Sequence, residues 1–322
     1  MSAVEILTMG RIGVDLYPEQ TGVRLADVRT FRKMLGGSAT NVAVAAARYG
    51  RRSGVITKVG DDPFGPYARQ ALAEFGVDAS RVGTHPTLRT PVVFCEIFPP
   101  DSFPLLFYRE PTAPDMTLEA AELDLDEIAS VPLFWTTGTG LSAEPSRSAT
   151  LTALVARGRR AITIHDLDYR PGFWSSEEEA GRWGREAVAL ATVAVGGSAE
   201  AAPLVGDRPA ADAARALLDL GAKLAVVKLG PEGVLAATRD EVVTVPPVPV
   251  EVVNGLGAGD AFGGALCHGL LSGWELERTL RFANAAGALV ASRLGCADDM
   301  PTEGEVDALL ATVPGTLVPG TG

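Results

Sequence analysis

The sequence predicts a doubly wound α/β fold, in which a mostly parallel central sheet is flanked by helices on both faces. Short apolar runs alternate with longer amphipathic segments along the 322 residues, which is the order of strands and crossover helices. The apolar runs are nearly continuous Val, Ile and Leu, as in strands that are covered on both faces. With 47% hydrophobic residues, the chain can bury one large core, and we expect a single domain over residues 1–313.

The candidate elements follow one another in chain order. Amphipathic helices are predicted at 38–50, from a capping serine to Gly50, at 62–76, ending at Gly76, and at 175–191, with acidic residues in its first turn. Strands are predicted at 5–10, 53–60, 133–139, 161–168, 192–197 and 224–230.

Two segments, 15–35 and 90–111, interrupt this alternation because neither has a helix between its extended pieces. The second resembles a hairpin around "PPDSFP". We expect a small antiparallel β lid beside the sheet, although an edge extension without a role fits the same pattern. Residues 314–322 are rich in Pro and Gly and are expected to form a flexible tail.

The composition excludes several classes of function. A formal charge of −12 without a block of Lys and Arg argues against nucleic-acid binding. No stretch approaches the roughly 18 apolar residues of a membrane span, and the first residues do not resemble a signal peptide, so we expect a soluble cytoplasmic protein. The three cysteines and three histidines show no metal-binding or disulfide spacing.

The stretch "NGLGAGDAF" at 254–262 is the strongest functional signal. Gly257, Ala258 and Gly259 place backbone N–H groups at the start of a predicted helix, where an anion is favoured. Asp260 follows directly; it is either a helix-dipole residue or, beside a bound phosphate, a general base. The chain has no P-loop motif, and "MGRIGVD" lacks the GxGxxG spacing of a dinucleotide site.

Further motifs carry a family resemblance. "NGLGAGDAFGGAL" and "GGSATNVAVAAARYG" resemble the two signatures of the ribokinase (PfkB) family of small-molecule kinases. Between them lie "KVGDDPFG", "DLDYRPGFW", "GGSAE" and "KLGPEG", each where that family has a motif. The similarity spans residues 4–312.

The resemblance implies a ribokinase-like fold with a lid over a sugar pocket. It implies transfer of the γ-phosphoryl group of ATP, with Mg²⁺, to the terminal hydroxymethyl group of a sugar acid. The motifs are most similar to those of enzymes that act on 5-dehydro-2-deoxy-D-gluconate in myo-inositol catabolism. Other acceptors, namely 2-keto-3-deoxygluconate, fructose or ribose, remain open, as does a non-catalytic sugar-acid sensor.

By position in the motifs, Asp260 is the expected base and 257–260 the anion hole. Arg109 and Arg170 are expected to bind the acceptor carboxylate or the transferring phosphoryl group, because guanidinium binds either bidentately. The remaining expected substrate residues are Asp15, Gly36, Gly37 and Asn41; the expected nucleotide residues are Lys228, Gly230, Gly233 and Asn284, and Glu200 is expected to hold Mg²⁺ through water.

Three positions depart from the family pattern. Gly197 replaces the usual asparagine of an NxxE motif, and Asp168 stands where related kinases often carry asparagine. Asn254 replaces a carboxylate that holds a monovalent cation in many members, so a K⁺ requirement is an open question. Because "VVFCEIF" would be an apolar edge if it were left free, we also expect a homodimer formed through the lid.

Overall fold

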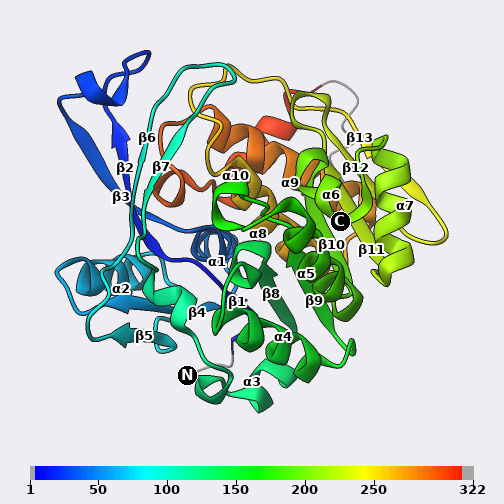
Figure 1. The fold of residues 1–322 in the computed structure, drawn as a ribbon. Coiled ribbons are helices and arrows are strands. Elements are labelled where there is room, and N and C mark those ends of the chain that lie inside the picture. Colours follow the sequence, from blue (N-terminus) through cyan, green and yellow to red (C-terminus); the bar gives the residue numbers. More distant parts are fainter. Residues whose placement is uncertain (1–3, 314–322) are drawn as a thin grey trace.

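The computed structural model describes residues 4–313, so the predicted tail at 314–322 lies outside the described residues. Its centre is a nine-stranded sheet (Figure 1). In spatial order the strands are β13 (Val242–Val245), β12 (Val234–Ala237), β11 (Leu224–Lys228), β10 (Val193–Gly197), β9 (Ile162–Asp166), β8 (Leu133–Thr137), β1 (Ile6–Met9), β4 (Ser53–Gly60) and β5 (Val82–His85).

Pairing in this sheet is mostly parallel. All neighbouring strands from β11 to β5 pair in parallel, whereas β12 is antiparallel to both β11 and β13. The six predicted strands are all present. The doubly wound, mostly parallel α/β fold is therefore confirmed.

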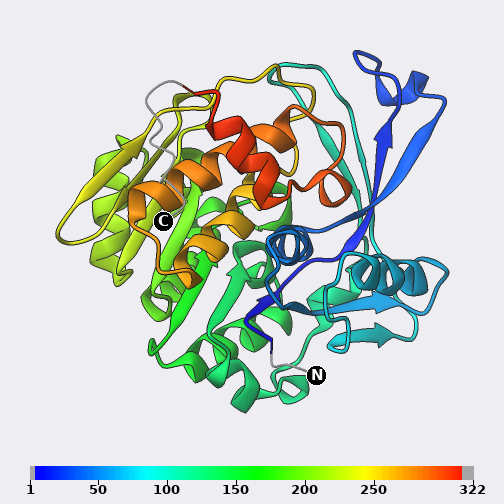
Figure 2. The same ribbon diagram turned by 180° about the vertical axis from the view of Figure 1, so that it is seen from behind.

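Helices cover both faces of the sheet (Figures 1 and 2). One face carries α1 (Ser38–Arg48), α2 (Phe64–Glu74), α8 (Ala258–Leu271), α9 (Leu276–Ala291) and α10 (Glu303–Leu310). The other carries α3 (Leu125–Ser130), α4 (Ser146–Arg157), α5 (Glu177–Leu190), α6 (Ser198–Val205) and α7 (Ala210–Leu220). Short 3₁₀ turns occur at Leu25–Asp27, Pro114–Thr117, Ala120–Glu122, Gly138–Leu141, Pro171–Phe173, Gly230–Glu232 and Ala297–Asp299.

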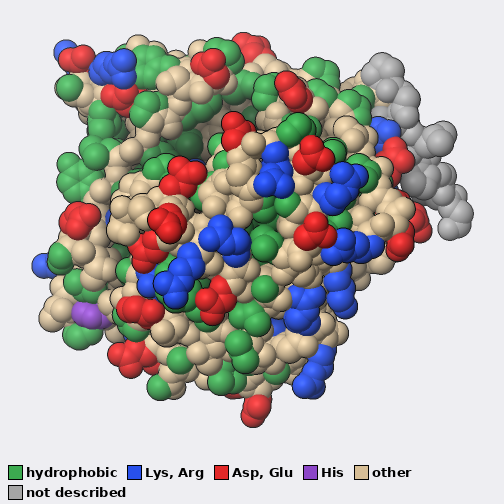
Figure 3. Space-filling model, turned by 45° about the vertical axis from the view of Figure 1, so that its right-hand side comes forward, with side chains coloured by type: hydrophobic (Ala, Val, Ile, Leu, Met, Phe, Trp, Pro, Cys, Tyr) green, Lys and Arg blue, Asp and Glu red, His purple; other side chains and the backbone are tan. Residues whose placement is uncertain are grey.

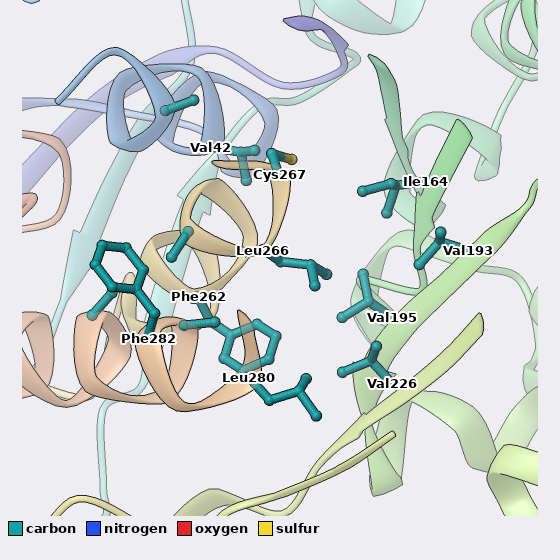
Figure 4. Packing of buried hydrophobic residues seen from close by; sticks show 14 of the residues in the cluster. Val42, Ile164, Val193, Val195, Val226, Phe262, Leu266, Cys267, Leu280 and Phe282 are labelled. Atoms are coloured by element: carbon teal, nitrogen blue, oxygen red, sulfur yellow. The ribbon is translucent and has the colours of Figure 1, made fainter. Parts of the chain in front are cut away.

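The two-residue period of the strands divides the core into these two layers. In β10, Val193 and Val195 pack with Phe262 of α8 and Leu280 of α9, as Figure 4 shows. Ala194, between them, belongs to the cluster under α5, α6 and α7. Burial on both faces explains why the strands read as continuous apolar runs.

A second sheet of four strands stands apart from the first, and we call it the lid sheet (Figure 1). Its order is β3 (Phe31–Gly36), β2 (Gly13–Pro18), β6 (Val92–Cys95) and β7 (Leu105–Tyr108). Strands β2 and β3 are antiparallel, as are β6 and β7, while β2 and β6 pair in parallel. These strands come from the two segments that interrupt the helix–strand alternation.

The capping expectation for α1 is wrong by one residue. Gly37, at φ 107°, is the N-cap, and Ser38 is the first helical residue without a capping bond. The Ser38 hydroxyl donates instead to Asp168 at 3.1 Å, across the junction between α1 and the segment after β9. The Ser38 oxygen also accepts from Arg11 Nη2 at 3.1 Å, so both hydrogen bonds of this hydroxyl are tertiary contacts.

On the face drawn in Figure 3, acidic and basic side chains are interspersed. Within residues 4–313, no helix combines the length and apolar character needed to cross a bilayer. Cys95, Cys267 and Cys296 are buried free thiols.

Candidate active site

A cleft lies between the lid sheet and the body of the protein. It opens beyond the carboxyl ends of β1 and β9, where ligands bind in open α/β sheets. Its walls include Gly13, Asp15, Tyr17, Val93, Leu105 and Phe107 from the lid sheet, and Arg11, Gly37, Ser38, Asn41, Arg109, Arg170, Leu256, Gly257, Asp260 and Cys296 from elsewhere.

The glycine turn forms the start of α8. Gly257 is the N-cap in the left-handed region, at φ 82°, and a Cβ there would lie 2.5 Å from Cys296 Sγ. A Cβ at Gly259 would lie 3.2 Å from Lys228 Nζ. Gly257 is thus required for both conformation and space, whereas Gly259 lets the Lys228 amine approach the turn. Its N–H groups belong to the first turn of a 14-residue helix, which lacks intrahelical acceptors.

Asp260 faces the cleft from this first turn. Its Oδ2 accepts a hydrogen bond from Asn41 Nδ2 at 2.8 Å, and within residues 4–313 it forms no ion pair. Burial raises the pKa of Asp260 to about 6; the Asn41 bond opposes that rise and the Asp168 carboxylate adds to it. A carboxylate with this pKa is ionised at neutral pH and basic enough to accept a proton from a hydroxyl group.

Asp15 projects into the cleft from β2, and Gly36 on the neighbouring strand makes room for it. A Cβ at Gly36 would lie 2.1 Å from Asp15 Oδ1, so the carboxylate occupies that space. Tyr17 donates to Asp15 Oδ2 at 3.4 Å. Burial raises the pKa of Asp15 to about 7, which Arg11 opposes and Asp260 reinforces. Gly37 is equally constrained, because a Cβ there would lie 2.3 Å from the Arg11 carbonyl oxygen.

The two predicted arginines both line the cleft, and each already has a carboxylate partner. Arg109 Nη2 lies 2.9 Å from Oδ2 of the buried Asp115. Arg170 Nε lies 3.1 Å from Asp168 Oδ1, and the Arg170 side chain is 42% exposed. Asp168 raises the pKa of Arg170 above its ordinary value.

Arg11 is a cleft residue that the sequence reasoning missed. It lies just beyond β1, after Gly10, and its Nη2 lies 3.0 Å from Asp168 Oδ2. Although burial alone would raise it, the guanidinium groups of Arg11 and Arg170 hold the pKa of Asp168 well below its ordinary range. The signal was available, because "MGRIGVD" places Arg11 at the carboxyl end of a central strand.

Lys228 lies beside the glycine turn, at the end of β11. Its Nζ is 3.8 Å from Glu200 Oε2. Burial disfavours its charged form, but the Glu200, Asp166 and Asp260 carboxylates together raise the pKa of Lys228. Burial raises the pKa of Asp166 to about 8, although Lys228 opposes that rise. Glu200 Oε2 also accepts from the Gly197 N–H at 2.6 Å, so Glu200 caps α6 without the usual asparagine.

The remaining expected nucleotide residues lie outside the cleft walls. Gly230 and Gly233 have φ 57° and 99° in the turn between β11 and β12. Asn284 Nδ2 donates to the Pro246 carbonyl at 2.8 Å. Asn254 donates to Leu294 O at 2.7 Å and accepts from the Leu256 N–H at 3.1 Å. In the part of the chain that the structure describes, no three His, Cys, Asp or Glu side chains form a metal-binding group.

Comparison with known proteins identifies the family. The model of the pfkB family of carbohydrate kinases matches residues 4–303. The chain is 33% identical over 306 residues to the 5-dehydro-2-deoxygluconokinase of Clostridium perfringens, an alignment that covers 92% of this chain and 90% of the relative.

Solved structures agree with this result. A fructokinase from Vibrio cholerae, in a form with fructose, ADP and calcium, matches with a TM-score of 0.84 and 27% identity, over 96% of this chain and 99% of the other. A putative ribokinase II from Escherichia coli, in complex with ATP and Mg²⁺, has the same fold, with a TM-score of 0.86 at 23% identity over 96% and 99% of the two chains. The chain therefore belongs to the pfkB family of carbohydrate kinases, and it is a phosphotransferase with an alcohol group as acceptor.

Proposed function

We propose that the protein phosphorylates the terminal hydroxymethyl group of a sugar acid, with 5-dehydro-2-deoxy-D-gluconate as acceptor and its 6-phosphate as product, as a step of myo-inositol catabolism. The observation that carries this proposal is Asp260, a carboxylate that faces the cleft beside the glycine turn and forms no ion pair within residues 4–313. The relative from Clostridium perfringens, named for this acceptor, supports the choice of substrate.

The proposed reaction is a direct phosphoryl transfer. The acceptor oxygen forms a bond to the γ-phosphorus of ATP, the bond from that phosphorus to the bridging oxygen breaks, and ADP leaves. Asp260 takes the hydroxyl proton, while the N–H groups of residues 257–260 stabilise charge on the phosphoryl oxygens. Asn41 orients the Asp260 carboxylate through their hydrogen bond.

The remaining residues bind the two substrates in this proposal. Asp15 accepts hydrogen bonds from acceptor hydroxyl groups, Gly36 provides the space for its carboxylate, and Gly37 allows the close approach of the Arg11 backbone at the cleft wall. Lys228 contacts the nucleotide phosphates beside Gly259. Gly230 and Gly233 shape a turn over the nucleotide, and Asn284 lies near adenine. Glu200 suits Mg²⁺, which keeps most of its water ligands and needs only one or two carboxylates.

Arg109 and Arg170 are proposed to bind the acceptor carboxylate, and an acceptor panel tests this assignment. ADP release is measured with 5-dehydro-2-deoxygluconate, 2-keto-3-deoxygluconate, fructose and ribose. Arg109→Ala should raise KM for the acids and leave a neutral sugar nearly unchanged. Because this change strips the buried Asp115 of its partner, Asp115→Asn with Arg109→Ala is the matched control. Equal losses for all acceptors would refute the carboxylate assignment.

We also propose a homodimer formed through the lid sheet. The expectation that "VVFCEIF" is a free edge is wrong, because β6 lies between β2 and β7. Strand β7 lies at the edge of this sheet, and its Leu106 and Tyr108 are 45% and 61% exposed. An exposed apolar edge strand is a natural pairing surface. Sedimentation at micromolar concentration should show a dimer that Leu106→Lys weakens, and a monomeric wild type would contradict the proposal.

A further inference from the structure

We propose that Arg11 is a further acceptor-recognition residue, which binds an oxyanion group of the acceptor, and that Asp168 is the residue that positions it. The identity of the acceptor rests on the proposed function above, but the anion site itself does not. Three features of the described residues carry this inference: the bonding of the guanidinium group, the local charge balance and the acceptor capacity of Asp168.

Two nitrogens of the Arg11 guanidinium, Nε and Nη2, donate hydrogen bonds within residues 4–313, whereas Nη1 does not. Nε donates to Thr139 Oγ1 at 3.0 Å, and Nη2 donates to Ser38 Oγ at 3.1 Å and to Asp168. Nη1 has no hydrogen-bond acceptor among residues 4–313, and the side chain, 9% exposed, lines the cleft. A donor fixed in this way binds a ligand with little loss of side-chain entropy.

The ion-paired group around Arg11 carries a net positive charge, which the nearby carboxylates of Asp15 and Asp260 face across the cleft. Arg109 is matched one to one by Asp115. In contrast, Arg11 and Arg170 share the single carboxylate of Asp168, so this group of three carries one net positive charge. The carboxylates of Asp15 and Asp260 also line the cleft, but they suit acceptor hydroxyl groups, which donate hydrogen bonds.

Asp168 provides more acceptor capacity than the family's usual asparagine could. Its Oδ2 accepts from Arg11 at 3.0 Å, from Ser38 at 3.1 Å and from Thr139 at 2.8 Å, and its Oδ1 accepts from Arg170 at 3.1 Å. An asparagine offers one acceptor oxygen, and its NH₂ group would face these donors. The presence of Arg11 thus explains the aspartate at this position.

An oxyanion in this cleft is either the acceptor carboxylate or the phosphoryl group in transfer. Lys228 lies beside Gly259 of the phosphate turn and is not among the cleft-lining residues. Arg11 lines the acceptor cleft together with Asp15 and Asn41. The positions of the two cations therefore favour the acceptor carboxylate as the ligand of Arg11.

The test is calorimetric titration without nucleotide, with 5-dehydro-2-deoxygluconate and D-gluconate as acidic probes and D-fructose as the neutral one. Arg11→Gln should weaken the binding of both acids by about 10- to 100-fold, as expected for a lost hydrogen bond to a charged group, and change fructose binding less than about threefold. Arg11→Lys should recover part of the loss. Asp168→Asn should weaken the acids similarly, and the double variant should add little to either single change.

Two further arginines provide matched controls. Arg157→Gln removes a buried arginine bonded to the Val131 carbonyl at 2.6 Å, near the opposite ends of the strands, and should lower Tm without changing acid affinity. Arg215 forms an exposed ion pair with Asp212, so Arg215→Gln makes the same change of charge and should alter neither Tm nor the affinity for acids.

Several outcomes would overturn the inference. Unchanged acid affinity with a lower kcat would assign Arg11 to the phosphoryl group. Equal losses for acids and fructose, or a wild type that binds no acid, would also refute it. If the wild type releases no ADP with any acid, the proposed function fails, whereas a loss of acid binding in Arg11→Gln would still support the anion site.

Discussion

Gly36→Ala should weaken acceptor binding, because the added methyl group displaces the Asp15 carboxylate. Gly36 ends β3, outside the left-handed region of the backbone, so alanine brings no conformational strain there. Its Cβ would lie 2.1 Å from Asp15 Oδ1 and 2.2 Å from Asp15 Cγ. Because nonbonded heavy atoms pack at about 3.5 Å, the Asp15 carboxylate must retreat by more than about 1 Å.

The size of the effect follows from that displacement. A misplacement of about 1 Å costs up to about 10²-fold in rate, and each lost hydrogen bond to a charged group costs about 1.5–3 kcal/mol. We therefore expect kcat/KM for the acid acceptor to fall by about 30- to 300-fold, mainly through KM of the acceptor. KM for ATP should change less than about threefold, because Asp15 lines the cleft that we propose as the acceptor site.

The assay is initial-rate ADP release with the acceptor and ATP varied in turn. Gly304→Ala is the matched control, because a Cβ there meets nothing within 4 Å, and it should behave as wild type. Asp15→Asn should reproduce most of the Gly36→Ala defect. The reasoning is refuted if Gly36→Ala leaves the acceptor KM unchanged, or if KM for ATP rises as much as KM for the acceptor.

Three further predictions concern ionisation and the nucleotide. The kcat/KM for the acceptor should fall as pH drops through 7 and 6, because protonation of Asp15 (pKa about 7) weakens its hydrogen bonds to acceptor hydroxyl groups and protonation of Asp260 (pKa about 6) removes the general base; a flat pH profile would contradict this. The folded-state pKa of Asp260, about 6, lies above its ordinary value of 3.8, so the stability of the folded protein falls as pH rises from 3.8 to about 6 and the carboxyl group ionises. Asp260→Asn should therefore leave Tm at pH 8 equal to or above that of wild type. A clearly lower Tm for the variant would show that the carboxylate stabilises the fold. Lys228→Met should raise KM for ATP by about tenfold and leave acceptor affinity unchanged in titrations, and the reverse pattern would place Lys228 in the acceptor site.

Much of the fold was predictable because each central strand is buried on both faces and is therefore a continuous run of apolar residues in the sequence. Strands β4 and β10 match their predicted ranges within one residue. Helix α5 begins beside Ser176, which accepts from the Glu179 N–H as a local cap. These features depend on neighbours in sequence, which is why the sequence reveals them.

The site was predictable only in part, because its partners lie far apart in the chain. Asp260 and Asn41 are 219 residues apart, yet they form one hydrogen bond. Arg11 looked like one arginine among many until the fold placed it against Asp168, 157 residues later. The Ser38 hydroxyl takes part in the same cluster, because it accepts from Arg11 Nη2 and donates to Asp168 Oδ2, while Gly37 occupies the N-cap position of α1. Tertiary pairing of this kind leaves no periodic signal in a single sequence.

One comparison tests directly whether Asp260 is the general base of the reaction. ADP release is measured with 5-dehydro-2-deoxygluconate, ATP and Mg²⁺ for wild type and for Asp260→Asn, which keeps the shape of the side chain and an oxygen for the Asn41 bond. We predict a kcat at least about 10²-fold lower for the variant, with a folded protein and nearly unchanged acceptor affinity. A variant whose kcat stays within about threefold of wild type would show that Asp260 is not the general base.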